Sequence, residues 1–301
     1  MAKLSTRISR SAIGAILSLL ATFQLCSAQT TPATPSPLTR HYTEGEKLTY
    51  HMKGSNDGWT YELQANGIVK KDGNGHFVEE FGWADFKSSA PMTLSPASLS
   101  FRQTLSLDPA VSPSVPDLSV VQPFLIGPIT DLLTFYADLW MAARQTTLVH
   151  SGDHAYVKFG GPISWADGQY VILGEDSIDF DLTLKEIDAA SQTATLVVRH
   201  VPPAQPTVKL PAAWMRTPVA DTPNNWIDVK KNAAGKYVAE VGKETFDVEI
   251  KLSLKDGKIL SATLDNPVQA RKRECTDAAL LDCNELTDDN IHRHIELQLV
   301  P

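Results

Sequence analysis

The stretch that decides the fold is residues 245–264, TFDVEIKLSLKDGKILSATL. The apolar residues of its first half recur at every second position: Phe246, Val248, Ile250 and Leu252. Such alternation is typical of a strand with one buried face and one wetted face. The Lys255–Gly257 triplet supplies residues that tolerate a tight turn, and a second strand follows as far as Leu264. The stretch therefore predicts an antiparallel hairpin.

The same alternation recurs along the chain and predicts about ten strands in all. The others are expected over 48–53, 59–65, 76–86, 147–159, 169–173, 178–185, 194–201, 237–241 and 291–300. One helix is expected over Pro128–Arg144, because its apolar residues recur at helical spacing and Pro128 suits a first turn. Asp131 and Asp138 lie off this apolar stripe. We therefore expect a mainly β fold, a large curled antiparallel sheet or open barrel with one principal helix and an α+β flavour.

The N-terminal residues 1–28 have the three zones of a secretory signal peptide. Basic residues come first, an apolar run covers 12–25, and the small residues Ser27 and Ala28 precede the expected cleavage site. A Thr/Pro-rich linker is expected over 29–40, followed by a β-rich domain over 41–301 with Pro-rich excursions at 91–127 and 202–225. These features predict a periplasmic or secreted protein.

The charge of the chain is acidic, and removal of the three basic residues of the signal changes the formal net charge from −8 to −11. Such a charge repels nucleic acid, so no nucleic-acid partner is expected. No apolar stretch of the mature chain is long enough to span a bilayer as a helix, so we expect a soluble protein. No feature indicates a particular oligomeric state.

Two cysteines remain after the signal, Cys275 and Cys283. An even number of cysteines in an oxidising compartment favours a disulfide. A metal or redox pair is the alternative, but the spacing is not Cys-x-x-Cys and no second pair exists. No cofactor is expected.

The opening of the β-rich domain, Tyr42-Thr-Glu-Gly-Glu-Lys-Leu-Thr-Tyr50, resembles the start of exported bacterial proteins that begin with an aromatic residue, Gly-Glu and a strand. The layout as a whole is similar to the periplasmic lipoprotein-carrier superfamily, in which a curled antiparallel sheet is capped by helical segments around an apolar cavity. The chain departs from it in having one clear helix and two long Pro-rich segments. The resemblance implies binding of an acyl chain or a similar ligand and assigns no site residues.

Aromatic residues provide the candidate ligand contacts. Tyr136 and Trp140 lie on the expected helix, which is a candidate lid over a cavity, although core packing is the simpler interpretation. Trp165 and Trp226 lie in loops beside Gly or Pro, where they either line a pocket or plug the ends of a β core. No residue forms a convincing catalytic arrangement.

Three polar patterns are candidate metal or catalytic sites. His292, His294 and Glu296 share one face of a strand and are of the types that zinc binds, but the outer pair lies roughly 13 Å apart, so we expect no metal site. The acidic run 175–181 lacks the spacing of a calcium loop. Ser151–His154 is expected to be a hairpin turn, because catalytic triads are assembled across space.

We therefore expect an exported protein that binds or carries an apolar, lipid-like ligand without catalysis. One alternative is a secreted hydrolase acting on carbohydrate or another extracellular polymer, which needs two carboxylates across a cleft. Another is a cell-envelope interaction module with no small ligand.

Overall fold

The computed structural model describes residues 36–56, 58–90, 92–114, 116–158, 179–201 and 210–301, which belong to one compact unit of the chain. Several expectations fall outside these residues. They are the signal peptide 1–28, the linker as far as residue 35, the strand 169–173 and the loop residue Trp165.

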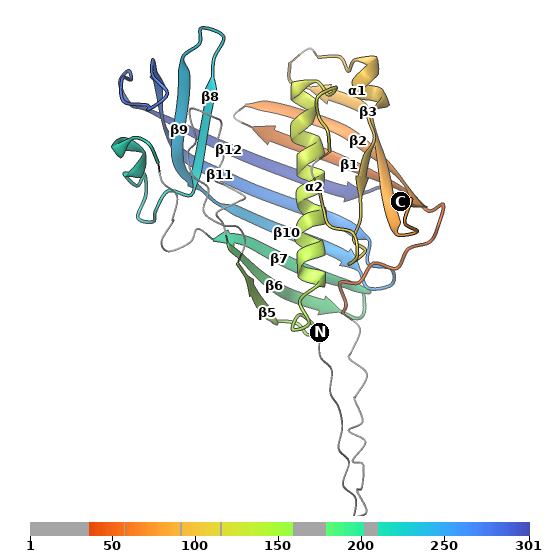
Figure 1. Ribbon diagram of the computed structural model, residues 1–301. Helices are drawn as coiled ribbons and strands as arrows, with labels where there is room; N and C mark the ends of the chain where they lie inside the picture. Colours follow the sequence, from red (N-terminus) through yellow and green to blue (C-terminus); the bar gives the residue numbers. More distant parts are fainter. Residues whose placement is uncertain (1–35, 57, 91, 115, 159–178, 202–209) are drawn as a thin grey trace, which may run out of the picture. The chain divides into compact units, whose positions relative to one another are not determined.

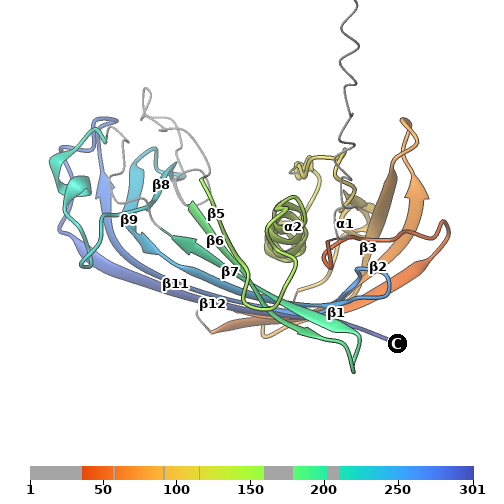
Figure 2. The same ribbon diagram turned by 90° about the horizontal axis from the view of Figure 1, so that it is seen from below.

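The described residues form a twelve-stranded antiparallel sheet that curls without closing (Figures 1 and 2). The mainly β fold is therefore confirmed. Across the sheet its main path is β4 (Gln103–Leu105), β3 (Phe77–Ser88), β2 (Trp59–Lys71), β1 (Lys47–Asn56), β12 (Thr287–Leu299), β11 (Ile259–Cys275), β10 (Phe246–Ser253), β7 (Thr193–Val201), β6 (Asp179–Asp188) and β5 (His154–Val157). The predicted hairpin 245–264 supplies β10 and the start of β11 at its centre.

The long strand β11 changes its partner on one side. Its first half pairs with β10, and its second half, from Val268 to Cys275, pairs with β9 (Tyr237–Glu244). β9 in turn pairs with β8 (Trp226–Lys231). Pro267 lies at the change of partner, where its missing N–H interrupts no bond to β9 or β10.

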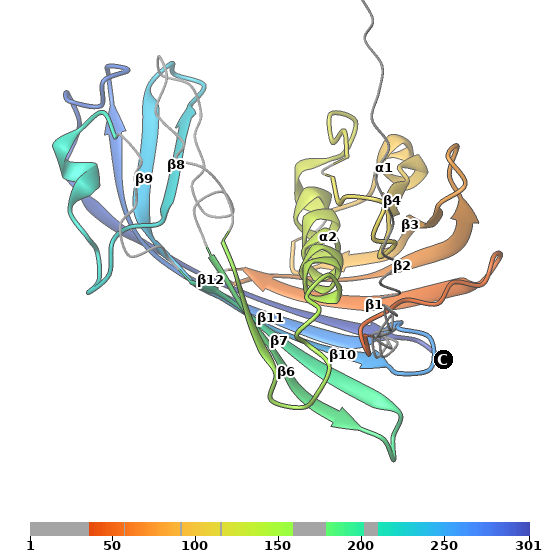
Figure 3. The same cartoon turned by 60° about the horizontal axis from the view of Figure 1, so that its bottom comes forward.

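The helix α2 (Pro123–Ala143) lies on the concave face of the sheet (Figures 2 and 3). The expected start at Pro128 is wrong: the helix begins at Pro123, and Pro128 is buried inside it. Asp131 and Asp138 lie off the apolar stripe of the helix, yet both are buried, with exposures of 1% and 2%. Both residues lie beside the apolar stripe of α2, and the curled sheet is wide enough to cover them as well.

Three other boundaries differ from expectation. The strand expected over 147–159 is reduced to β5, because Asp153 accepts hydrogen bonds from the amides of Val149 and His150 and holds a turn. The excursion 91–127 contains α1 (Pro96–Ser100), β4 and the first turn of α2. β8 follows the second excursion and had not been expected; the short helix η2 (Ala213–Arg216) precedes it.

The apolar residues form two clusters. The larger joins α2 to the concave face of the sheet, and the smaller joins η2 to β8, β9 and the region of Cys275. Among the described residues, no helix has both the length and the apolar character needed to cross a membrane.

Candidate functional site

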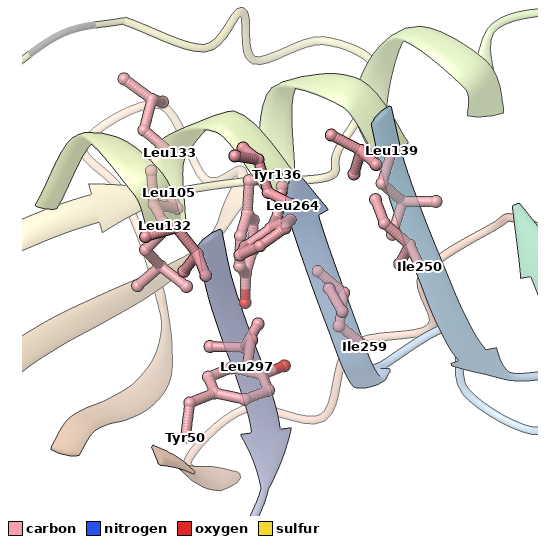
Figure 4. Packing of buried hydrophobic residues seen from close by; sticks show 14 of the residues in the cluster. Tyr50, Leu105, Leu132, Leu133, Tyr136, Leu139, Ile250, Ile259, Leu264 and Leu297 are labelled. Carbon is pink, nitrogen blue, oxygen red and sulfur yellow. The ribbon is translucent and has the colours of Figure 1, made fainter. Parts of the chain in front are cut away.

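The concave face of the sheet offers α2 an aliphatic floor. Figure 4 shows Leu132, Tyr136 and Leu139 of α2 facing this floor. The floor residues labelled there come from four strands: Tyr50, Ile250, Ile259, Leu264 and Leu297. All of these side chains are at most 1% exposed, so α2 fills the space above the floor.

A buried ionic network ties α2 to the beginning of the domain. Arg40 Nε donates to Glu79 Oε1 at 3.0 Å, and its Nη2 donates to Glu46 at 2.7 Å. Tyr136 donates its hydroxyl hydrogen to the other oxygen of Glu79. Burial raises the pKa of Glu79 even though the charge of Arg40 and the hydrogen bond from Tyr136 oppose the rise. Each group of this network has a partner, which indicates a structural role.

A second polar group lies between α2 and the sheet, and we call it the helix–sheet cluster. Its members are Tyr61, Asp131, Asp138, His200, Phe246 and Arg293. Tyr61 donates to Asp131 Oδ2 at 2.9 Å, and Arg293 Nη1 lies 3.3 Å from Asp131 Oδ1. His200 Nε2 lies 3.6 Å from Asp138 Oδ1.

Phe246 joins the two halves of the helix–sheet cluster. Its ring centroid lies 4.4 Å from that of His200 and 5.6 Å from the guanidinium carbon of Arg293. The strands explain this proximity, because Phe246 of β10 is directly opposite His200 of β7. Asp131 and Asp138 are seven residues apart on α2, about two helical turns or 10 Å, so both face the sheet.

Burial dominates the electrostatics of Asp131. It raises the pKa of this carboxyl, although the charge of Arg293 and the hydrogen bond from Tyr61 act in the opposite direction. Burial, followed by the negative charge of Asp131, also raises the pKa of Tyr61 well above its ordinary value. A buried charge of this kind is unfavourable unless its hydrogen bonds are complete.

The hydrogen bonds of the helix–sheet cluster are incomplete. Among the described residues, no hydrogen-bond partner exists for Asp131 Oδ1, Asp138 Oδ2, Arg293 Nε or either ring nitrogen of His200. The indole N–H of the nearby Trp59, whose ring stacks on Tyr61 at 5.4 Å, lacks one too. Buried polar atoms are nearly always hydrogen-bonded to protein, water or a ligand. The cluster therefore leaves donors and acceptors that are open to a bond with water or with a polar group of a ligand.

Three of the four aromatic residues expected to contact a ligand are among the described residues, and they belong to two elements. Tyr136 is buried in the ionic network. Trp140 is half-buried on α2, where its N–H donates to Asp108 O at 3.3 Å and Arg144 lies over its ring. Trp226 begins β8, and Trp165 is outside the described residues. Of the three described residues, Tyr136 and Trp140 share α2.

The disulfide Cys275–Cys283 is confirmed. It closes the end of β11, next to Leu280, which is fully buried in the smaller apolar cluster.

The histidines of β12 meet on one carboxylate. His292 Nε2 lies 2.7 Å from Asp265 Oδ1, and His294 Nδ1 lies 3.5 Å from the same oxygen. Within the described part of the chain, no three His, Cys, Asp or Glu residues are placed to hold a metal ion.

The carboxylates of the outer sheet face are paired across strands. Asp247 lies 3.0 Å from Arg199, and Glu249 lies 2.8 Å from Lys185. Both belong to a shallow open hollow, and their basic partners line it as well. This pairing is typical of a solvated sheet face and not of an acid and a base held across a cleft.

Sequence reasoning missed the helix–sheet cluster. The seven-residue spacing of Asp131 and Asp138 places both on one helix face, each directly before a leucine of the buried stripe, and this signal was present in the sequence. His200 and Arg293 carried no such signal, because only the pairing of distant strands brings them under α2.

Comparison with known proteins found no family model and no curated protein that matches this sequence.

Proposed function

We propose that the protein binds an apolar, lipid-like ligand on the concave face of its sheet and is not a catalyst. The observation that carries the proposal is the long helix α2, which covers the aliphatic floor of an unclosed sheet (Figure 2). Because the leucines of α2 fill this space, α2 must move to admit the ligand. We propose that α2 is a displaceable cover.

The magnitudes favour a ligand with two acyl chains. Burial of a leucine-sized side chain contributes about 1.5–3 kcal/mol, and burial of one CH₂ group contributes about 0.8 kcal/mol. α2 presents seven large apolar side chains to the core: Leu125, Ile129, Leu132, Leu133, Phe135, Tyr136 and Leu139. Two chains of about 14 CH₂ groups each contribute about 22 kcal/mol, which covers the whole range of about 10–21 kcal/mol for these side chains, whereas one chain contributes about 11 kcal/mol and covers only its lower end.

Buried charges under α2 lower the cost of displacing it. Asp131 and Asp138 are almost fully buried, and a buried ion loses several kcal/mol of hydration that its pairing only partly restores. Outward movement of α2 opens both carboxylates to water or to a polar group of the ligand. The closed arrangement is therefore less favourable than an all-apolar contact of the same area.

The proposal is tested by extraction of small molecules from the natively purified full chain, followed by mass spectrometry and by uptake of a fluorescent diacyl probe. We expect recovery of an acyl-chain compound or saturable uptake of the probe. An empty extract together with no uptake overturns the proposal.

A matched pair of variants locates the binding surface. Leu264→Gln places an amide on the aliphatic floor, whereas Thr263→Gln places the same side chain on the exposed face of the same strand. We expect weaker uptake only in Leu264→Gln, with folding of both variants checked by circular dichroism. Equal uptake by the two folded variants contradicts a site on the floor.

A further inference from the structure

We infer that the helix–sheet cluster binds the head group of the ligand, and that this head group is zwitterionic, with a primary ammonium next to an anionic oxygen group such as phosphate. The inference rests on the proposed function and adds the chemical class of the ligand.

The cluster lies where the concave face changes from aliphatic to polar. The inward residues of β10 and β7 are aliphatic as far as the opposed pair Val248 and Val198, and the next inward pair is Phe246 and His200. On β12 the change occurs between Ile295 and Arg293. An amphipathic ligand with its chains on the aliphatic floor has its head at this border.

The cluster atoms that lack a hydrogen bond are of both kinds, although Asp131 Oδ1 also forms an ion pair with Arg293 Nη1. Asp131 Oδ1 and Asp138 Oδ2 are carboxylate acceptors, whereas Arg293 Nε and Trp59 Nε1 are donors. His200 adds one donor and one acceptor when its ring is neutral. A ligand that completes these bonds must therefore both donate and accept.

This mixture of hydrogen-bond donors and acceptors favours some classes of head group over others. A purely anionic head meets two buried carboxylates, and an uncharged ester head provides no donor for them. An ammonium donates to Asp138, and the adjacent anionic group accepts from Arg293 through charge-assisted bonds. Glu79 is not part of this site, because Arg40 and Tyr136 already occupy its oxygens.

The test compares three lipids with identical dimyristoyl chains as competitors for the fluorescent diacyl probe on the full chain, each presented at the same mole fraction in micelles of a non-ionic detergent. The lipids are dimyristoyl phosphatidylethanolamine, dimyristoyl phosphatidylglycerol and dimyristoylglycerol. We expect the ethanolamine lipid to bind about tenfold more tightly than the other two, since charge-assisted hydrogen bonds are the strong ones.

Variants test whether the helix–sheet cluster causes the preference for ethanolamine. Asp138→Asn keeps the size of its side chain and Arg293→Gln removes the guanidinium charge, and each is expected to reduce the preference for ethanolamine at least threefold. Asp247→Asn and Arg199→Gln make the same changes in an exposed ion pair of the outer face and are expected to leave it unchanged.

The outcomes separate the two proposals. If all three lipids bind equally, the head-group inference is overturned and the proposed function stands. If none binds, both are overturned. A preference for ethanolamine that survives Asp138→Asn and Arg293→Gln overturns the assignment to this cluster. If Arg293→Gln fails to fold, Asp138→Asn and the three-lipid comparison on the unchanged chain still decide.

Discussion

Tyr42 to Tyr50 show how single residues hold the start of the domain. Tyr42 accepts a hydrogen bond from the amide of Leu107 and stacks on Phe77. The carboxylate of Glu46 accepts hydrogen bonds from Arg40 and Lys258. Tyr50 is buried in the core. The residues that carry the family resemblance therefore have structural roles in this chain.

Asp131 makes the stability of the protein depend on pH. Its pKa is 3.8 ordinarily and is raised in the folded state, so the folded chain binds more protons than the unfolded chain between these two values. The contribution of Asp131 to the free energy of unfolding therefore falls as the pH rises through this window. We expect the stability of the parent relative to Asp131→Asn to be greater at pH 4 than at pH 7, measured by urea denaturation. The opposite order contradicts the burial of this carboxyl.

Gly257 is required by a close approach of the chain. Its φ is +69°, and an added Cβ would lie 2.2 Å from the carbonyl oxygen of Thr39. We expect Gly257→Ala to lower the free energy of unfolding by more than about 1 kcal/mol. Gly45→Ala is the control, because its φ is +80° but no atom lies within 4 Å of the added Cβ. An equal effect of the two changes argues against the contact with Thr39.

The helix α2 shows what hydrophobic spacing indicates and what it leaves open. Spacing located its apolar stripe, because the stripe packs on the sheet as expected. It did not locate the start, because Pro123 looked like the end of a Pro-rich segment and not like the first residue of a helix. Packing of Leu125 and Ile129 supports the additional turn, and Thr130 donates its hydroxyl to the carbonyl oxygens of Ile126 and Gly127 beside Pro128.

The disulfide stabilises the part of the sheet formed by β8, β9 and the end of β11. Residues Cys275 and Cys283 are eight apart, and closure of so short a loop contributes roughly 2–3 kcal/mol in the chain-entropy model. We expect the double change Cys275→Ser and Cys283→Ser to lower the free energy of unfolding by that amount, measured by urea denaturation. The control is reductant, which should destabilise the parent and leave the variant unchanged. A variant as stable as the oxidised parent contradicts this role.

At the scale of the whole molecule, the sequence predicted the class of the fold but not the order of the strands. Alternation identifies which face of a strand is buried, and it is silent about partners far along the chain. The pairing of β1 with β12 joins the two ends of the domain, and the pairing of β10 with β7 skips β8 and β9. The helix–sheet cluster depends on these pairings, which explains why Asp131 and Asp138 had a signal and His200 and Arg293 had none.

The displacement of α2 by ligand is the central claim, and a distance between α2 and the sheet tests it most directly. Spin labels at Thr134→Cys on α2 and Lys251→Cys on the outer face of β10, with Cys26→Ser to prevent other labelling, report this distance by pulsed electron paramagnetic resonance. We predict that a saturating diacyl probe lengthens the mean distance between the labels. Saturable binding of the probe with an unchanged distance distribution would contradict the account.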